Sequence, residues 1–156
     1  MSFAKAFDIE VRVVPGISSC IAVPELQEVP LTCRGVNESF WVLTGTTQSG
    51  HLSKDVAIAA QSSATAVILM GMRKIAEITA LFARYGKAQT PVMVIQNGSR
   101  QQERTVLGTV ENIAEKVKAA GVGAPGIIVI GEVVALHPEL NYATVAQQKL
   151  KTHKPN

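Results

Sequence analysis

Three uninterrupted apolar runs dominate the pattern of hydrophobic and polar positions along the chain. They are "TAVILMG" (65–71), "PVMVIQNG" (91–98) and "PGIIVIGEVVAL" (125–136). A short run that is apolar at every position is typical of a strand covered on both faces. The pattern therefore predicts buried strands at residues 65–70, 91–96 and 126–134.

Weaker strand signals lie between these runs. β-Branched and aromatic residues gather in "VRVVPG" (11–16), "SFWVLTG" (39–45) and "RTVLGT" (104–109). Such residues fit the pleated surface of a sheet, and the glycine or proline that closes the first two runs marks a strand end. We expect strands in all three segments, with 104–109 pairing with a strand close to it in the sequence.

Helical signals alternate with the strands. "ISSCIAVPELQ" follows the first strand signal with Ser18 or Ser19 as N-cap, a helix is expected at 72–85, and "VENIAEKVKAAG" is amphipathic over 110–121. Residues 48–64 read as a polar loop with a weakly helical middle. The alternation predicts an α/β fold with a central mixed sheet of about five strands flanked by helices.

Composition adds the broad class. The 156 residues are 47% hydrophobic and 17% charged, which suits one globular domain, and the net charge of +3 lies partly in "QQKLKTHKPN". We expect a domain at 1–137 and a basic C-terminal tail at 138–156 that is solvated rather than bound to nucleic acid. The apolar runs are too short to span a membrane, and Cys20 and Cys33 form no CxxC pair. A reduced, cytoplasmic protein is expected.

Familiar catalytic motifs are scarce in this sequence. It contains no P-loop, GxGxxG, nucleophile elbow or HExxH, so we name no catalytic residue and no metal ligand. Glycines instead follow the expected strand ends, at Gly16, Gly71, Gly98 and 126–131. Ligands of open α/β sheets bind beyond strand ends, where a glycine lets them approach the backbone.

Five motifs then carry a family resemblance. They are "VRVVPGISS", "VPLTCRG", "VILMGM", "PVMVIQNGSRQQERTVLGTVENIAE" and "PGIIVIGEVVAL". Over about residues 5–137 their order and spacing resemble the C-terminal half of the uroporphyrinogen-III C-methyltransferase branch of the tetrapyrrole methylase family. The resemblance implies transfer of methyl groups from S-adenosylmethionine to two ring carbons of uroporphyrinogen III, giving precorrin-2 on the way to sirohaem or cobalamin. It also implies a cytoplasmic homodimer.

The resemblance implies a set of residues that bind the methyl donor. Met70 matches a residue that contacts S-adenosylmethionine, and a polarizable thioether suits the donor's mixed surface. Ser18 and Ser19 match a pair at a helix start that holds the donor, Gly98 matches a glycine beside the nucleoside, and Gly126 matches a small residue near the adenine. The alternatives are a gap-filling methionine, a plain helix cap and an ordinary turn glycine. We assign the neighbouring Met72 to the core.

Cationic side chains are candidates for the carboxylates of such a substrate. Arg34 is the predicted substrate-binding residue and Arg100 a second candidate, although each could be an ordinary exposed arginine. The sequence departs from the family pattern at Cys33, where relatives usually carry histidine.

The second departure from the family pattern is that the motifs of the family's N-terminal half do not occur in this sequence. We therefore expect the chain to supply one wall of the site and to be inactive alone. The alternative is a noncatalytic α/β module for dimerisation or regulation.

Overall fold

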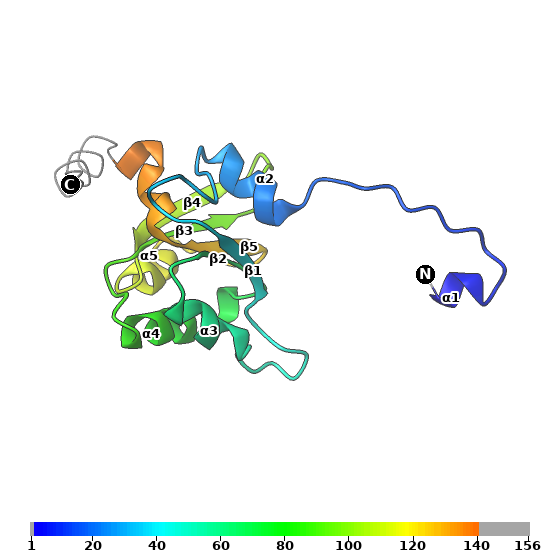
Figure 1. Ribbon diagram of the computed structural model, residues 1–156, viewed down its shortest axis with the longest axis horizontal. Helices are drawn as coiled ribbons and strands as arrows, with labels where there is room; N and C mark the ends of the chain where they lie inside the picture. Colours follow the sequence, from blue (N-terminus) through cyan, green and yellow to red (C-terminus); the bar gives the residue numbers. More distant parts are fainter. Residues whose placement is uncertain (1, 141–156) are drawn as a thin grey trace, which may run out of the picture.

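Five strands form one mixed sheet in the order β1-β2-β5-β3-β4 in the computed structural model, which describes residues 2–140 (Figure 1). The strands are β1 (Phe40–Thr44), β2 (Thr65–Leu69), β3 (Pro91–Gln96), β4 (Arg104–Thr109) and β5 (Gly126–Ile130). The α-helices are α1 (Ser2–Lys5), α2 (Ser19–Leu26), α3 (Asp55–Gln61), α4 (Ile75–Arg84) and α5 (Ile113–Ala119). Short 3-10 helices lie at Met72–Lys74, Glu132–Leu136 and Pro138–Leu140. The predicted fold class is confirmed.

Strand direction explains why the sheet is mixed. β1 and β2 are parallel and joined through α3, whereas β2 pairs with β5, β5 with β3, and β3 with β4 in antiparallel fashion. β3 and β4 follow each other directly, as we expected for 104–109, because an antiparallel pair needs no crossover helix. The central position of β5 between β2 and β3 brings together segments that are far apart in the sequence.

Both faces of the three central strands are buried, as their apolar runs predict. On one face Ala66, Ile68, Val92, Val94, Ile128 and Ile130 pack against α3, α4 and α5. On the other, Val67, Met93, Ile95, Ile127 and Val129 pack against α2 and the segment after β5. The alternation of neighbouring residues between the two clusters is the period of two that a pleated strand imposes. The result is a three-layer α/β/α body with helices on opposite faces of the sheet (Figure 1).

Helix predictions are confirmed, with small differences at the ends. Ser18 is the N-cap of α2, and its hydroxyl pairs with Cys20 Sγ at 2.9 Å instead of capping a backbone N–H. The helix expected at 72–85 begins with a 3-10 turn and continues as α4, ending before Gly86, whose φ of +78° suits glycine. The weak helical signal within 48–64 corresponds to α3.

Two strand predictions are wrong. Residues 11–16 form no strand; they belong to an extended arm that leads away from the body to α1, and Val13 and Val14 are 70% and 85% exposed (Figure 1). A strand needs a partner, and this arm has none among residues 2–140. The strand expected at 126–134 ends at Ile130, because the chain turns at Gly131 into the 3-10 helix Glu132–Leu136. An apolar run alone does not distinguish a buried strand from a buried helical turn.

The predicted tail begins within the structure. Residues 138–140 form a 3-10 helix, and the remainder of the tail, 141–156, lies outside the described residues. Among residues 2–140 no helix is both long and apolar enough to cross a membrane.

Candidate functional site

The strand pairing brings several strand ends together. They form one edge of the sheet, which is made of strand ends and not of an outer strand. Gln96, the last residue of β3, pairs with Gly126, the first residue of β5. Ile68 of β2 pairs with Ile128 of β5, so continuing this antiparallel register by two residues sets Met70 opposite Gly126. β1 runs parallel to β2 and ends at the same edge. This edge therefore collects the segments after β1, β2 and β3 and the segment before β5.

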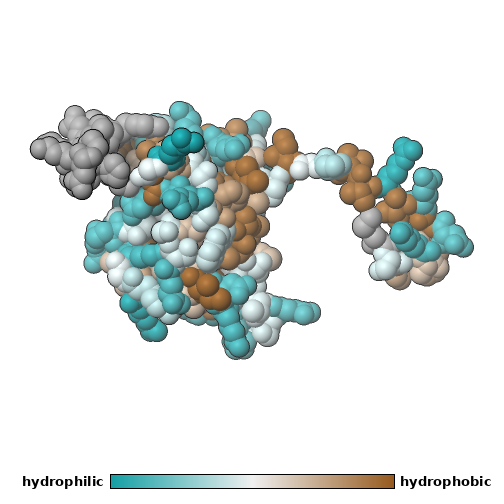
Figure 2. Space-filling view, viewed as in Figure 1, coloured by the Kyte–Doolittle hydropathy of each residue, from teal (hydrophilic) through white to brown (hydrophobic). Residues whose placement is uncertain are grey.

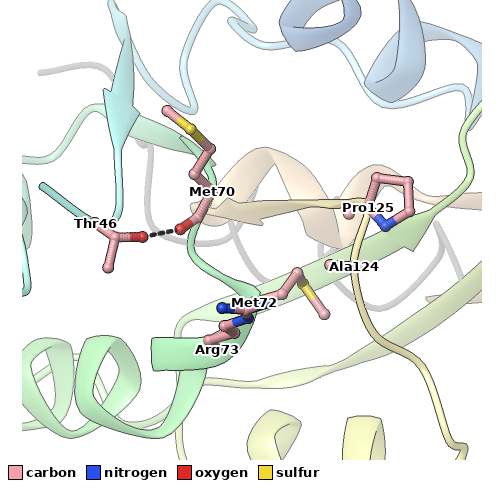
Figure 3. Close-up of a pocket in the computed structure, with 7 residues that line it drawn as sticks. Thr46, Met70, Met72, Arg73, Ala124 and Pro125 are labelled. Atoms are coloured by element: carbon pink, nitrogen blue, oxygen red, sulfur yellow. Dashed lines mark hydrogen bonds between the residues drawn. The ribbon is translucent and has the colours of Figure 1, made fainter. Parts of the chain in front are cut away.

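Two adjoining cavities hollow this edge, and together we name them the edge cleft. The first has a volume of about 400 Å³ and is lined by Thr46, Met70, Met72, Arg73, Ala124, Pro125 and Gly126 (Figure 3). The second has a volume of about 500 Å³ and is lined by Ser19, Val23, Leu69, Ile95, Asn97, Gly98, Arg100, Pro125, Gly126 and Ile127. Because both share Pro125 and Gly126, the two cavities lie on either side of the start of β5.

The backbone around Met70 explains how its side chain reaches the edge cleft. The N–H of Gly45 donates to the carbonyl of Leu69 at 2.7 Å, and the Thr46 hydroxyl donates to the carbonyl of Met70 (Figure 3). A Cβ on Gly45 would lie 2.6 Å from Gly71 Cα, so the two strand ends approach each other through glycines. Met70 has a φ of +54° and its side chain is 65% exposed. This left-handed conformation directs the thioether outward, away from Met72 (Figure 3).

Glycines also shape the rest of the edge cleft. A Cβ on Gly98 would lie 2.5 Å from Val23 Cγ1, so the loop after β3 packs directly on α2. A Cβ on Gly126 would lie 3.0 Å from Met72 Sδ and 3.1 Å from the carbonyl oxygen of Gly123. Any larger residue at either position would displace a wall of the cleft.

The charge at the edge cleft is one-sided. Arg73 lines the first cavity and Arg100 the second, and no aspartate or glutamate among residues 2–140 lines either. Within residues 2–140 the only ion pair is Lys74–Glu77, so neither arginine has a carboxylate partner there. Apolar walls with cationic groups at both ends suit an anionic ligand that also has apolar parts.

Four of the six predicted site residues meet at the edge cleft. Ser19, Met70, Gly98 and Gly126 line it although they are far apart in the sequence. Ser18 precedes Ser19 but does not line either cavity.

Arg34 lies in a turn near the start of β2, at the opposite ends of the strands from the edge cleft. Asn37 accepts a hydrogen bond from the N–H of Cys33 at 2.9 Å and donates to the hydroxyl of Thr65 at 2.9 Å. Thr65 is the first residue of β2, whereas Met70 follows the last. The turn that carries Arg34 is thus separated from the cleft by the length of β2.

Sequence reasoning missed several lining residues. Met72, assigned to the core, packs against it and also directs its thioether along the cavity toward Ala124 and Pro125 (Figure 3). Thr46 directly follows a predicted strand end and could have been found by the strand-end rule that selected the glycines. Arg73 carried no such signal, because nothing in the sequence says toward which side of the helix start it points.

An α/β sheet with a glycine-shaped cleft beyond its strand ends has the geometry typical of an α/β protein with a small-molecule site. The family model named Tetrapyrrole (Corrin/Porphyrin) Methylases matches residues 1–114 of the sequence. The chain therefore belongs to this family. It is 38% identical over 132 residues to uroporphyrinogen-III C-methyltransferase of Methanocaldococcus jannaschii, a match that covers 83% of this chain and 54% of that protein.

Two further relatives agree with this family membership. The chain is 39% identical over 137 residues to the S-adenosyl-L-methionine-dependent uroporphyrinogen III methyltransferase of Methanosarcina barkeri, covering 85% of this chain and 53% of that protein. Uroporphyrin-III C-methyl transferase from Thermus thermophilus, solved with S-adenyl homocysteine, superimposes with a TM-score of 0.71 at 29% identity, covering 86% of this chain and 58% of that one. The chain spans about half the length of the curated relatives it matches.

Proposed function

We propose that the edge cleft binds S-adenosylmethionine and that the chain serves the C-methylation of uroporphyrinogen III to precorrin-2, for sirohaem or cobalamin. The observation that carries this proposal is the convergence of Ser19, Met70, Gly98 and Gly126 on one cleft. These residues were selected from motifs in four separate parts of the sequence. Relatives bearing the names of this methyltransferase, and one solved with S-adenyl homocysteine, support the same activity.

The edge cleft fits the methyl donor in size and chemistry. Its cavities of about 400 and 500 Å³ fall in the usual range for small-molecule sites. The Cβ positions of Gly98 and Gly126 are taken up by Val23 and Met72, so these two glycines allow α2 and the Met72 side chain to form close walls around the cleft. Met70 offers an exposed, polarizable side chain to the donor's apolar parts. When bound, the donor supplies an activated methyl group, while this chain's residues hold it in place and exclude water.

The one-sided charge of the cleft supports an acidic substrate. Uroporphyrinogen III carries many carboxylates, and charge-assisted bonds to arginine are the usual means of binding them. Arg73 and Arg100 line the cleft without a carboxylate partner among the described residues. Arg34 stays a prediction as a substrate-binding residue, and its place at the opposite edge of the sheet gives it no support.

We further propose that the domain of residues 1–137 supplies one wall of the complete site. The exposed apolar arm supports this division, since Val13, Val14 and Ile17 are 70%, 85% and 89% exposed, and Figure 2 shows hydrophobic atoms along it. Methyl transfer depends on holding donor and acceptor at attack distance in a dry cleft. One wall leaves the donor open to water, so the chain alone is expected to bind weakly and not to turn over. We also propose that the protein is located in the cytoplasm.

Calorimetry and complementation test this function together. The chain is titrated with S-adenosylhomocysteine, then assayed anaerobically with uroporphyrinogen III and labelled S-adenosylmethionine, alone and with the N-terminal half of the Methanocaldococcus jannaschii relative. Weak binding, with label in precorrin-2 only when both halves are present, supports the proposal. No binding of S-adenosylhomocysteine at millimolar concentration would refute donor binding, and turnover by the chain alone would refute the one-wall arrangement.

An association module is the second candidate, favoured by one surface. β1 is an edge strand whose Phe40, Trp41 and Val42 are 37%, 37% and 43% exposed, and Ile58 of α3 is 56% exposed beside it. Exposed apolar side chains on a sheet edge are typical of an interface. We propose a homodimer formed through the exposed surface of β1 and α3. Light scattering of the wild type and of Trp41→Lys tests it: a dimer that the substitution dissociates supports the interface, and a monomeric wild type refutes it.

A further inference from the structure

A network of three side chains joins the two walls of the second cavity. One oxygen of Glu103 accepts a hydrogen bond from Gln27 Nε2 at 2.6 Å, and the other accepts from the N–H of Ser99 at 2.6 Å. The amide oxygen of Gln27 accepts from the Thr105 hydroxyl at 2.8 Å. Gln27 is the C-cap of α2, whereas Ser99 belongs to the loop after β3. A single carboxylate therefore bridges the helix and the loop.

The bridged loop has an unfavourable backbone conformation. Asn97 and Ser99, on either side of Gly98, have φ angles of +53° and +66°, which are uncommon for residues with a side chain. Such conformations persist where surrounding contacts hold them. The loop makes two turn hydrogen bonds of its own, from the Arg100 N–H to the Asn97 carbonyl and from the Glu103 N–H to the Arg100 carbonyl, both 3.0 Å long. The bond from the Ser99 N–H to Glu103 is the one that ties the carboxylate to the middle of the loop.

The α2 side of the bridge also affects the second cavity. Ser19 and Val23 of α2 line the second cavity, and Gly98 lies so close to Val23 that a Cβ there would be 2.5 Å from its Cγ1. A shift of α2 relative to the loop would thus change the gap between Ser19 and Gly98. Glu103 itself does not line either cavity.

We propose that Glu103 is a positioning residue, which fixes the loop at 97–100 against α2 and so sets the width of the second cavity. This inference rests on the proposed function, because the fixed loop presents Gly98 and Arg100 to the donor and substrate. Glu103 acts as a hydrogen-bond acceptor for two neutral donors. Its carboxylate has no ion-pair partner within the part of the chain that the structure describes.

Exchanging the two side chains of the bridge gives a sharp test. Gln27→Glu alone sets two carboxylates against each other at hydrogen-bond distance and should break the bridge. Combining it with Glu103→Gln restores every bond: the new amide oxygen accepts from the Ser99 N–H, its NH₂ donates to the new carboxylate, and that carboxylate accepts from Thr105. A matched control is Glu111→Ala, because Glu111 accepts from Gln89 Nε2 at 2.7 Å in a similar pair away from the cleft.

Two readouts separate this inference from the proposed function. Amide hydrogen exchange at Ser99 should become about tenfold faster in Gln27→Glu and return to the wild-type rate in the double variant. The dissociation constant for S-adenosylhomocysteine should follow the same order, weakening about tenfold and recovering, with Glu111→Ala unchanged in both readouts. If the wild type binds no S-adenosylhomocysteine, the donor-binding proposal fails while Ser99 exchange still decides whether the bridge fixes the loop.

Three outcomes would overturn the inference. The first is Ser99 exchange that Gln27→Glu leaves unchanged. The second is a double variant that does not recover. The third is faster Ser99 exchange in Gln27→Glu with no change in affinity for S-adenosylhomocysteine, where the wild type does bind this ligand. The bridge would then order the loop without serving the cleft.

Discussion

Gly126 and Met72 meet at the boundary between the two cavities of the edge cleft. A Cβ on Gly126 would lie 3.0 Å from Met72 Sδ and 3.1 Å from its Cγ. Met72 also packs against the core and lines the first cavity, so a side chain at residue 126 would press on a wall of this cavity. The size of residue 126 therefore controls the space available at the start of β5.

Gly126→Ala should weaken ligand binding more than it weakens the fold. The added methyl group must push aside the end of the flexible Met72 side chain, which costs the fold little, whereas the methyl group and the displaced thioether both take up space at the first cavity. We expect the dissociation constant for S-adenosylhomocysteine to rise about tenfold or more. Calorimetric titration measures this change. The control is Gly123→Ala in the same segment, whose Cβ would come no closer than 4.0 Å to any atom; equal weakening by both substitutions would contradict the argument.

Met70→Ala should reduce affinity and leave stability nearly unchanged. The side chain is 65% exposed, so its truncation removes little buried apolar area, and surface changes usually alter the free energy of unfolding by less than about 0.5 kcal/mol. A thioether that contacts the donor would nevertheless be lost. Urea unfolding and titration with S-adenosylhomocysteine are measured side by side. Tyr85→Ala, at a 46% exposed position at the end of α4 and outside both cavities, is the control and should leave affinity unchanged.

The central strands were predictable because their burial is recorded in the sequence. Residues at 65–69, 91–96 and 126–130 are apolar at nearly every position since both faces of the sheet are covered. The run at 11–14 has the same β-branched residues, but strand preference depends on neighbours that a sheet provides. No partner strand for this run exists among residues 2–140, and the arm stays extended and exposed.

The candidate site was predictable only in part, for a geometric reason. Gly98 follows a strand end and Gly126 begins a buried strand, so both lie in local patterns that the sequence shows, while their assignment to the methyl donor came from the family resemblance. Whether two strand ends share an edge depends on strand order and direction, which no local pattern gives. Arg34 was assigned to the substrate through the family resemblance, yet its turn is anchored at the first residue of β2, at the edge opposite Met70.

Lys87 should make the stability of the fold depend on alkaline pH. Burial lowers the pKa of its ammonium group from the usual 10.5, and the nearby Glu132 opposes this by raising it. The ammonium donates to the Ser62 carbonyl and lies 5.6 Å from the centre of the Phe82 ring. Because the folded-state pKa is lowered, the unfolded chain binds more protons in the range just below 10.5, and the free energy of unfolding rises with pH there.

Lys87→Met tests this pH dependence because it keeps the apolar stem beside Phe82 and removes the charge. The free energy of unfolding of the wild type, relative to this variant, should increase from neutral pH toward 10.5. Urea unfolding followed by the fluorescence of Trp41, the single tryptophan, measures it. Lys54→Met, at an exposed position, is the control for removing one positive charge. A difference that falls as pH rises would show that the charged form of Lys87 is favoured by the fold.

Gly98 and Val23 should behave as one coupled pair in a double-mutant cycle. In Gly98→Ala the new Cβ would lie 2.5 Å and 2.6 Å from the two methyl groups of Val23, which is 5% exposed and fixed on α2. Overpacking of this kind destabilises by about 1–3 kcal/mol, and α2 must move away from the loop after β3. Because Ser19 lies on the same helix, the second cavity should change width and affinity for S-adenosylhomocysteine should fall.

Val23→Ala removes the two methyl groups that the new Cβ would meet. Alone it leaves a small cavity and lowers the free energy of unfolding, by an amount that depends on how far the site collapses. Combined with Gly98→Ala, the two changes should compensate, giving a coupling energy of about 1 kcal/mol or more, as residues in contact show. Urea unfolding of the four proteins measures the coupling, and titration of the same set shows whether affinity recovers with it. Additive effects on stability would mean that Gly98 and Val23 do not touch and that the loop is not seated on α2.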